Sequence, residues 1–130
     1  MNEEGMIKSI LIVDDQSEVR ELVSVTLEIG DYQILTAENG YQALEQIRAH
    51  RPDLVLLDVM MPDGPDGLEI CRQIKSQYAT SGVYVIMLTA KGQEADQRAG
   101  FEAGANDYFI KPFSPLELIQ KVEAVLDRRA

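Results

Sequence analysis

The sequence predicts an α/β fold in which a doubly wound, five-stranded parallel sheet is flanked by five helices. Short, nearly continuous apolar runs recur along the chain and are typical of strands buried on both faces of a parallel sheet. Segments with helical apolar spacing separate these runs, and right-handed crossovers then cover both faces of the sheet. With 130 residues, the chain makes one ordinary domain.

The first two strands are expected at 10–13 and 33–37, each followed by an amphipathic helix. Ser17 is expected to cap the first helix, and Gly30 suits its end. The second helix stops before Arg51-Pro52, because the residue before proline disfavours helix. The apolar positions of the two helices are Val19, Leu22, Val23, Thr26 and Leu27, then Gly40, Ala43, Leu44 and Ile47.

The third strand is expected to end at Asp58, the fourth at Leu88 and the fifth at Lys111. Gly100 lies within the fourth helix, at a cost of about 1 kcal/mol relative to alanine, so this helix is the weakest. The last helix begins near Ser114-Pro115. The inner faces of the third and fourth helices carry Leu68, Cys71, Ile74 and Tyr78, then Ala95, Ala99 and Ala103.

Composition excludes several classes of function. A net charge of −10 and a pI near 4.4 argue against nonspecific contact with nucleic acid or an anionic membrane. No apolar stretch approaches the roughly 20 residues that span a bilayer. The single Cys71 cannot form an internal disulfide, and the acidic start at 1–5 lacks a signal-peptide pattern, so a cytoplasmic protein is expected.

Reactive side chains stand directly after four of the apolar runs. Ligands of such sheets bind beyond the carboxyl ends of the strands, so these side chains are expected to share one pocket. They are Asp14 and Asp15, Asp58, Thr89 and Lys111. Each also has a plain structural interpretation, as a helix cap, a turn residue or a surface charge, but all of those would have to hold at the same edge of the sheet.

Three close carboxylates are costly. Two unit charges 4 Å apart repel by about 4 kcal/mol at an effective dielectric of 20, so three cost roughly 12 kcal/mol. Either some are protonated or a cation neutralises them, and Mg²⁺ fits an incomplete carboxylate site. An ammonium and a hydroxyl beside such a metal suit phosphoryl transfer, in which a carboxylate can be the nucleophile.

Four segments together resemble the receiver domain of two-component response regulators. They stand in the family's order and at its spacing, and the resemblance covers 7–128 after an N-terminal tail at 1–6. It implies the flavodoxin-like strand order 2-1-3-4-5 of a chemotaxis regulator. The segments are Ile12-Val13-Asp14-Asp15, Asp58-Val59-Met60-Met61-Pro62, Leu88-Thr89-Ala90-Lys91 and Tyr108-Phe109-Ile110-Lys111-Pro112-Phe113.

The resemblance implies an acceptor and a metal site. Asp58 is the expected phosphoacceptor, supplied by a phosphohistidine on a sensor histidine kinase or a histidine phosphotransfer protein. Asp14 and Asp15 are the expected Mg²⁺ acids, one of them through water. Asp58 and the backbone carbonyl of Met60 complete the protein's share of the metal ligands.

The resemblance also implies a switch. Thr89 is expected to hydrogen-bond the phosphoryl oxygens and Lys111 to pair with them, after a cis peptide bond before Pro112. Tyr108 matches the aromatic residue that turns inward with Thr89, although a static strand aromatic is the plain alternative. The fourth helix, fifth strand and fifth helix then form the output surface for an effector domain, a downstream protein or a phosphorylation-dependent dimer.

One departure from the family pattern lies beside the acceptor. Three residues instead of two separate Pro62 from the following Asp66-Gly67, so the loop is longer and two more acids, Asp63 and Asp66, are expected near Asp58. The change bears on partner choice or access to the acceptor. The sequence does not identify the kinase, the stimulus, the output, the dephosphorylation rate or the oligomeric state.

Three functions compete. The leading hypothesis is a signalling module that catalyses only its own phosphorylation and dephosphorylation and is not an enzyme for an external substrate. A phosphatase with an aspartate nucleophile would need a second acid two residues later, where this chain has Met60. A pseudo-receiver would use the fold only to bind a partner.

Overall fold

The computed structural model describes residues 7–90 and 94–128, and it has the predicted α/β architecture. Its five parallel strands lie in the order β2-β1-β3-β4-β5, which confirms the predicted topology. The strands are β1 (Lys8–Val13), β2 (Tyr32–Ala37), β3 (Leu54–Asp58), β4 (Tyr84–Ala90) and β5 (Asp107–Lys111). The expected tail at 1–6, Lys91 and Gln93, near which the sequence predicts the start of the fourth helix, lie outside the described residues.

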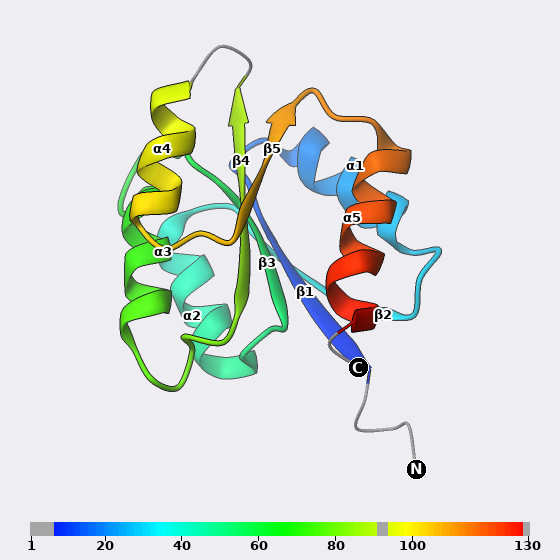
Figure 1. Ribbon diagram of the computed structural model, residues 1–130, viewed down its shortest axis with the longest axis horizontal. Helices are drawn as coiled ribbons and strands as arrows, with labels where there is room; N and C mark the ends of the chain where they lie inside the picture. The colour runs from blue at the N-terminus through cyan, green and yellow to red at the C-terminus, as the bar shows by residue number, and fades with distance from the viewer. Residues whose placement is uncertain (1–6, 91–93, 129–130) are drawn as a thin grey trace.

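Helices cover both faces of the sheet (Figure 1). On one face lie α1 (Ser17–Leu27) and α5 (Pro115–Arg128), and on the other α2 (Gly40–His50), α3 (Gly67–Ser76) and α4 (Glu94–Glu102). Within the described residues, every helix is too short or too polar to cross a membrane.

Two apolar layers explain why the strands read as continuous hydrophobic runs. Alternate residues of a strand point to opposite faces, and here each face meets helices. Leu54 and Leu56 pack with α1 and α5, whereas Val55 and Leu57 pack with α2, α3 and the turn after α4. All four are fully buried, as the predicted two-sided burial requires.

The strand register aligns the tips on which the site depends. Val13 pairs with Leu57, and Asp58 pairs with Leu88 on the next strand. β4 continues two residues beyond the predicted end at Leu88, so Thr89 still pairs within the sheet. Because all strands are parallel, their carboxyl ends reach the same edge.

Two predicted helix details are wrong. Ser17 does not cap α1, since Gln16 takes the N-cap position without a side-chain bond and Ser17 is already helical. The Val19 and Arg20 amides, which a Ser17 cap would meet, donate instead to the Gln16 carbonyl at 3.1 and 3.2 Å. Tyr78 does not belong to the inner face of α3, because the helix ends at Ser76 and Tyr78 is 99% exposed.

The predicted alanine stripe of α4 is wrong at its start, although Ala99 is half-buried and Ala103 is buried. Ala95 is exposed, and the helix presents Gly100 to the sheet instead. An ideal Cβ on Gly100 would lie 3.1 Å from Met87 Cγ on β4. The helix therefore approaches the sheet through its backbone and buries little side-chain area.

The lengthened loop between β3 and α3 fits closely against its surroundings. The backbone of Gly64 has a φ of 91°, and an ideal Cβ there would lie 2.5 Å from the Tyr41 ring of α2. A Cβ on Gly40 would collide with the Pro65 carbonyl. A Cβ on Gly67 would collide with the backbone of the β3 tip. Glycine is thus required where the loop crosses α2 and returns to β3.

Candidate functional site

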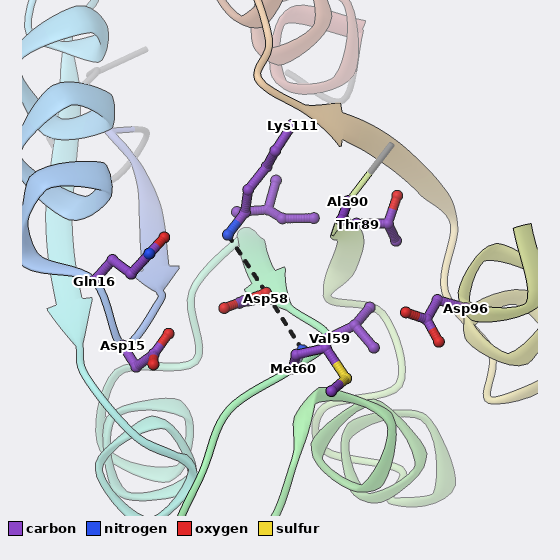
Figure 2. Close-up of a pocket in the computed structure, with 10 residues that line it drawn as sticks. Asp15, Gln16, Asp58, Val59, Met60, Thr89, Ala90, Asp96 and Lys111 are labelled. Atoms are coloured by element: carbon purple, nitrogen blue, oxygen red, sulfur yellow. Dashed lines mark hydrogen bonds and ion pairs between the residues drawn. The ribbon is translucent and has the colours of Figure 1, made fainter. Parts of the chain in front are cut away.

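The carboxyl ends of β1, β3, β4 and β5 bring four of the five predicted reactive residues to the wall of one cavity (Figure 2): Asp15, Asp58, Thr89 and Lys111. Carboxylate oxygens of Asp14, Asp15 and Asp58 lie within 4.8 Å of one another. The cavity has a volume of about 270 Å³. It is lined by Asp15, Gln16, Asp58, Val59, Met60, Leu88, Thr89, Ala90, Asp96 and Lys111.

The two acids after β1 have different environments. Asp14 is fully buried, and both its carboxylate oxygens are engaged, with the Gln16 amide at 2.9 Å and with Lys111 Nζ at 2.9 Å. Asp15 is exposed and lines the cavity. Asp15 can therefore offer an oxygen directly to a cation, whereas both carboxylate oxygens of Asp14 already accept hydrogen bonds. One oxygen of Asp14 thus accepts from a main-chain amide before α1, and the other forms the ion pair with Lys111.

Asp58 is a buried carboxyl group whose surroundings disfavour its ionised form. Its Oδ1 accepts from the Met60 amide at 3.3 Å and lies 3.5 Å from Lys111 Nζ. Burial, followed by the negative charge of Asp14, raises the pKa of Asp58 to about 7, although Lys111 acts in the opposite direction. The carboxylate form at neutral pH thus depends on nearby positive charge.

Lys111 supplies that charge from the end of β5. Its Nζ lies between Asp14 and Asp58, nearer to Asp14. Burial lowers the pKa of the Lys111 ammonium, but the hydrogen bond that it donates to Asp14 and the charge of Asp58 outweigh this effect, so the pKa lies above its usual value. The peptide bond between Lys111 and Pro112 is cis, as expected.

Thr89 and Tyr108 connect the cavity to the α4 side of the molecule. The buried Thr89 lines the cavity, while its Oγ1 donates to the Phe109 carbonyl at 3.4 Å. The half-buried Tyr108 ring meets Phe101 of α4 edge to face, with centroids 5.7 Å apart. The hydroxyl is thus held by β5, and the tyrosine ring lies against α4.

The loop acids do not join the cluster. Asp66 caps α3, since its carboxylate accepts from the Glu69 amide at 2.9 Å, and Asp63 is exposed. Neither acid is among the described residues that line the cavity or form the carboxylate cluster. Met60 projects its side chain outward with 69% exposure.

Two residues near the site were missed by sequence reasoning. Asp96 lines the cavity from the first turn of α4. Its signal was its place at the start of the helix that follows β4, because that end of the helix lies at the same sheet edge. Arg20 of α1 donates to the Asp14 carbonyl at 2.6 Å. A single arginine on a helix gives no comparable signal.

This arrangement suits the capture of a phosphoryl group. It combines a buried carboxylate, an ammonium, a hydroxyl in the cavity wall and a second carboxylate open to a cation. Positioning and charge neutralisation supply most of the catalysis in such transfers. The donor set is all oxygen, which fits Mg²⁺.

Known proteins share this sequence and structure. The family model of the response regulator receiver domain matches residues 10–123. The phosphate regulon transcriptional regulatory protein PhoB of Pseudomonas aeruginosa is 49% identical over 121 residues, which cover 93% of this chain and 52% of that protein. The transcriptional regulatory protein ResD of Bacillus subtilis is 50% identical over 119 residues, which cover 92% of this chain and 48% of that protein. The chain spans about half the length of these relatives.

Solved structures agree with these matches. The response regulator DrrB of Thermotoga maritima superposes with a TM-score of 0.84 at 36% identity, covering 95% of this chain and 54% of that one. The chemotaxis response regulator CheY4 of Vibrio cholerae has a TM-score of 0.84 at 30% identity, covering 92% of this chain and 98% of that one.

Proposed function

The chain belongs to the response regulator receiver domain family, and from this premise we propose that Asp58 accepts a phosphoryl group from a histidine kinase or a histidine phosphotransfer protein. The observation that carries the proposal is the Lys111 ammonium set between the carboxylates of Asp14 and Asp58. A charged nucleophile is kept there beside a cation that can also meet the incoming phosphoryl oxygens. The proposed domain spans 7–128.

The metal ligands that we propose follow the burial of the acids. Asp15 and Asp58 offer carboxylate oxygens, Met60 its backbone carbonyl, and the fully engaged Asp14 a contact through water. Mg²⁺, when bound, would neutralise the acids and favour the ionised form of Asp58. The raised pKa of Asp58 supports this assignment, because an unneutralised cluster holds a proton on that carboxyl up to about pH 7.

The proposed reaction is a direct transfer. A carboxylate oxygen of Asp58 attacks phosphorus, and the phosphorus–nitrogen bond of the phosphohistidine breaks. The electron pair of that bond returns to the imidazole ring. Lys111 pairs with the phosphoryl oxygens, and Thr89 turns its hydroxyl from the Phe109 carbonyl toward them. No external substrate is turned over.

We place the response to phosphorylation on α4, β5 and α5. Movement of Thr89 would free space beside β5, and the Tyr108 ring that now meets Phe101 would turn inward. This surface would contact an effector domain, a downstream protein or a second phosphorylated copy. Both relatives are named as transcriptional regulators, so an effector that binds DNA is proposed outside this acidic domain.

Two competing functions are less well supported. An aspartate-nucleophile phosphatase needs an acid two residues after the nucleophile, and Met60 cannot shuttle a proton. A pseudo-receiver does not need the Asp14–Lys111–Asp58 arrangement, yet that arrangement is complete here. We propose a cytoplasmic signalling module.

The test is uptake of phosphate from a small acyl phosphate, followed by the intact mass of the protein. We expect one Mg²⁺-dependent phosphoryl group on the parent chain and none on Asp58→Asn. Asp66→Asn, which alters a helix cap outside the cavity, is the matched control and should be labelled normally. Persistent labelling of Asp58→Asn would point to another acceptor, and steady hydrolysis of a phosphomonoester would favour the phosphatase.

A further inference from the structure

Arg20 is a charged side chain that the proposed reaction does not use, although it reaches the tip of β1. Its side chain is 19% exposed and extends from α1. One guanidinium nitrogen, Nη1, donates to the main-chain carbonyl of Asp14 at 2.6 Å. The other, Nη2, lies 4.0 Å from the Glu38 carboxylate. The guanidinium thus hydrogen-bonds the main chain after β1 and lies at ion-pair distance from an exposed carboxylate after β2.

The carbonyl that Arg20 holds belongs to the peptide unit that joins Asp14 to Asp15. Fixing this carbonyl fixes the plane of that peptide, and hence the direction in which the Asp15 side chain leaves the backbone. Asp15 is the exposed acid of the cluster. In the described part of the chain, no hydrogen bond or ion pair restrains its carboxylate. Its orientation therefore depends on the backbone.

Glu38, the acid that faces Arg20, is itself held by hydrogen bonds to α2. Glu38 follows β2, and its carboxylate accepts from Gln42 Nε2 at 3.3 Å. The Glu38 amide donates to Gln42 Oε1 at 2.9 Å, and Asn39 caps the same turn of α2. Arginine can bond in two directions at once through its planar fork, which a lysine ammonium does less well. The hydrogen bond to the Asp14 carbonyl is therefore the contact that fixes the β1 tip, and the ion pair with Glu38 orients the other arm of the guanidinium.

We propose that Arg20 is a positioning residue for divalent cation binding, acting by fixing the Asp14–Asp15 peptide so that Asp15 faces the cavity. This inference rests on the proposed function, in which the acidic cluster holds Mg²⁺. It also opposes the simplest electrostatic expectation. A positive charge beside an acidic cluster should repel Mg²⁺, so removal of the charge alone would tighten binding. Loss of the Asp15 orientation would instead weaken Mg²⁺ binding, so the two effects have opposite signs.

The experiment is Mg²⁺ titration of the whole chain by calorimetry, together with NMR of the Asp15 amide. Arg20→Met removes both the charge and the donors, and we expect Mg²⁺ affinity to fall roughly tenfold, as for other groups that orient metal ligands. Arg20→Lys keeps the charge and one donor and should recover most of the affinity. Arg20→Gln keeps a donor without the charge and should lie between them.

The matched control is Arg72→Met on α3, which removes the same charge from an exposed pair with Glu69. It should leave Mg²⁺ affinity and the Asp15 amide signal unchanged. Unchanged or tighter binding by Arg20→Met overturns the proposal and leaves the proposed function standing. If the parent chain binds no Mg²⁺, or if Asp15→Asn binds it as well as the parent does, the metal site of the proposed function itself fails.

Discussion

The fourth and fifth strands each carry one reactive residue to the cavity, but the helices that follow them are held very differently. α5 has 14 residues and buries Leu118, Val122, Val125 and Leu126 against the sheet. α4 has nine residues, and Gly100 is the buried one within it. Phe101 of α4 is 47% exposed. The two helices lie on opposite faces of the sheet (Figure 1).

Polar contacts reinforce the difference. Ser114 Oγ accepts from the Glu117 amide at 3.2 Å at the start of α5, and Lys121 pairs with Asp107 of β5 at 2.6 Å. α5 is therefore firmly attached to the sheet and to β5, the strand that carries Lys111. α4 has few apolar contacts and belongs to the low-stability end of the molecule, where a switch costs least to operate. The residue that must move in the proposed response, Thr89, precedes the looser helix.

The largest loss of stability is expected from a substitution of Lys111, the reactive residue on β5, which α5 supports. Lys111→Met leaves the carboxylates of Asp14 and Asp58 buried without their ammonium, and we expect a loss of about 3 kcal/mol in the free energy of unfolding near pH 8. Urea unfolding in the presence of a chelator measures it. Thr89→Ala is the equivalent change on β4, which precedes α4. It should lower the free energy of unfolding by about 1 kcal/mol, because one hydrogen bond is lost.

The cost of Lys111→Met should also depend on pH. The pKa of Asp58 is raised from 3.8 to about 7 on folding, so the folded chain binds this proton more tightly than the unfolded chain. Stability from this group is therefore present below about pH 4 and is lost as pH rises to about 7. Lys111 lowers the pKa of Asp58, so without it the loss continues to higher pH. A cost that is equal at pH 5 and pH 8 would contradict this coupling.

The next effect tests the anchoring of α5. Leu118 is fully buried between α5 and the sheet, and Leu118→Ala should lower the free energy of unfolding by about 2–4 kcal/mol. Leu116 lies two residues earlier with 62% exposure, and Leu116→Ala should stay within about 0.5 kcal/mol of the parent. Similar losses in the two variants would mean that α5 is not held by its buried face.

The smallest effect concerns Gly100 of α4. Alanine favours a helix by about 1 kcal/mol over glycine, and the new methyl group would press on the flexible Met87 side chain. We expect Gly100→Ala to slow hydrogen exchange of the α4 amides, with a net gain of about 0.5 kcal/mol in local stability. Ala99→Gly should act in the opposite direction. Faster exchange in Gly100→Ala would show that close backbone approach to Met87 holds the helix.

The sheet and its tips were predictable because their signals are local. Residues 54–57 are apolar without interruption, and only a strand covered on both faces requires that pattern. Once the strands are parallel, residues that directly follow them must meet at one edge. The positions of Asp58, Thr89 and Lys111 followed from that rule alone.

The remaining details depend on how helices sit on the sheet. Asp96 reaches the cavity, and Gly100 faces Met87, only because α4 takes one rotation about its axis. Its weak apolar pattern does not define that rotation. The Ser17 prediction failed because the helix begins one residue earlier, and the Val19 and Arg20 amides donate to the Gln16 carbonyl. The contact of Arg20 likewise depends on the angle between α1 and β1.

The fit of the lengthened loop has a consequence for chimaeras. The Pro65 carbonyl occupies the space in which position 40 would carry a Cβ, and Tyr41 lies against Gly64. Grafting 62–67 into a homologous scaffold would therefore require glycine at the position of Gly40 on α2. A graft of the contiguous segment alone would meet a steric block from a part of the chain more than twenty residues away.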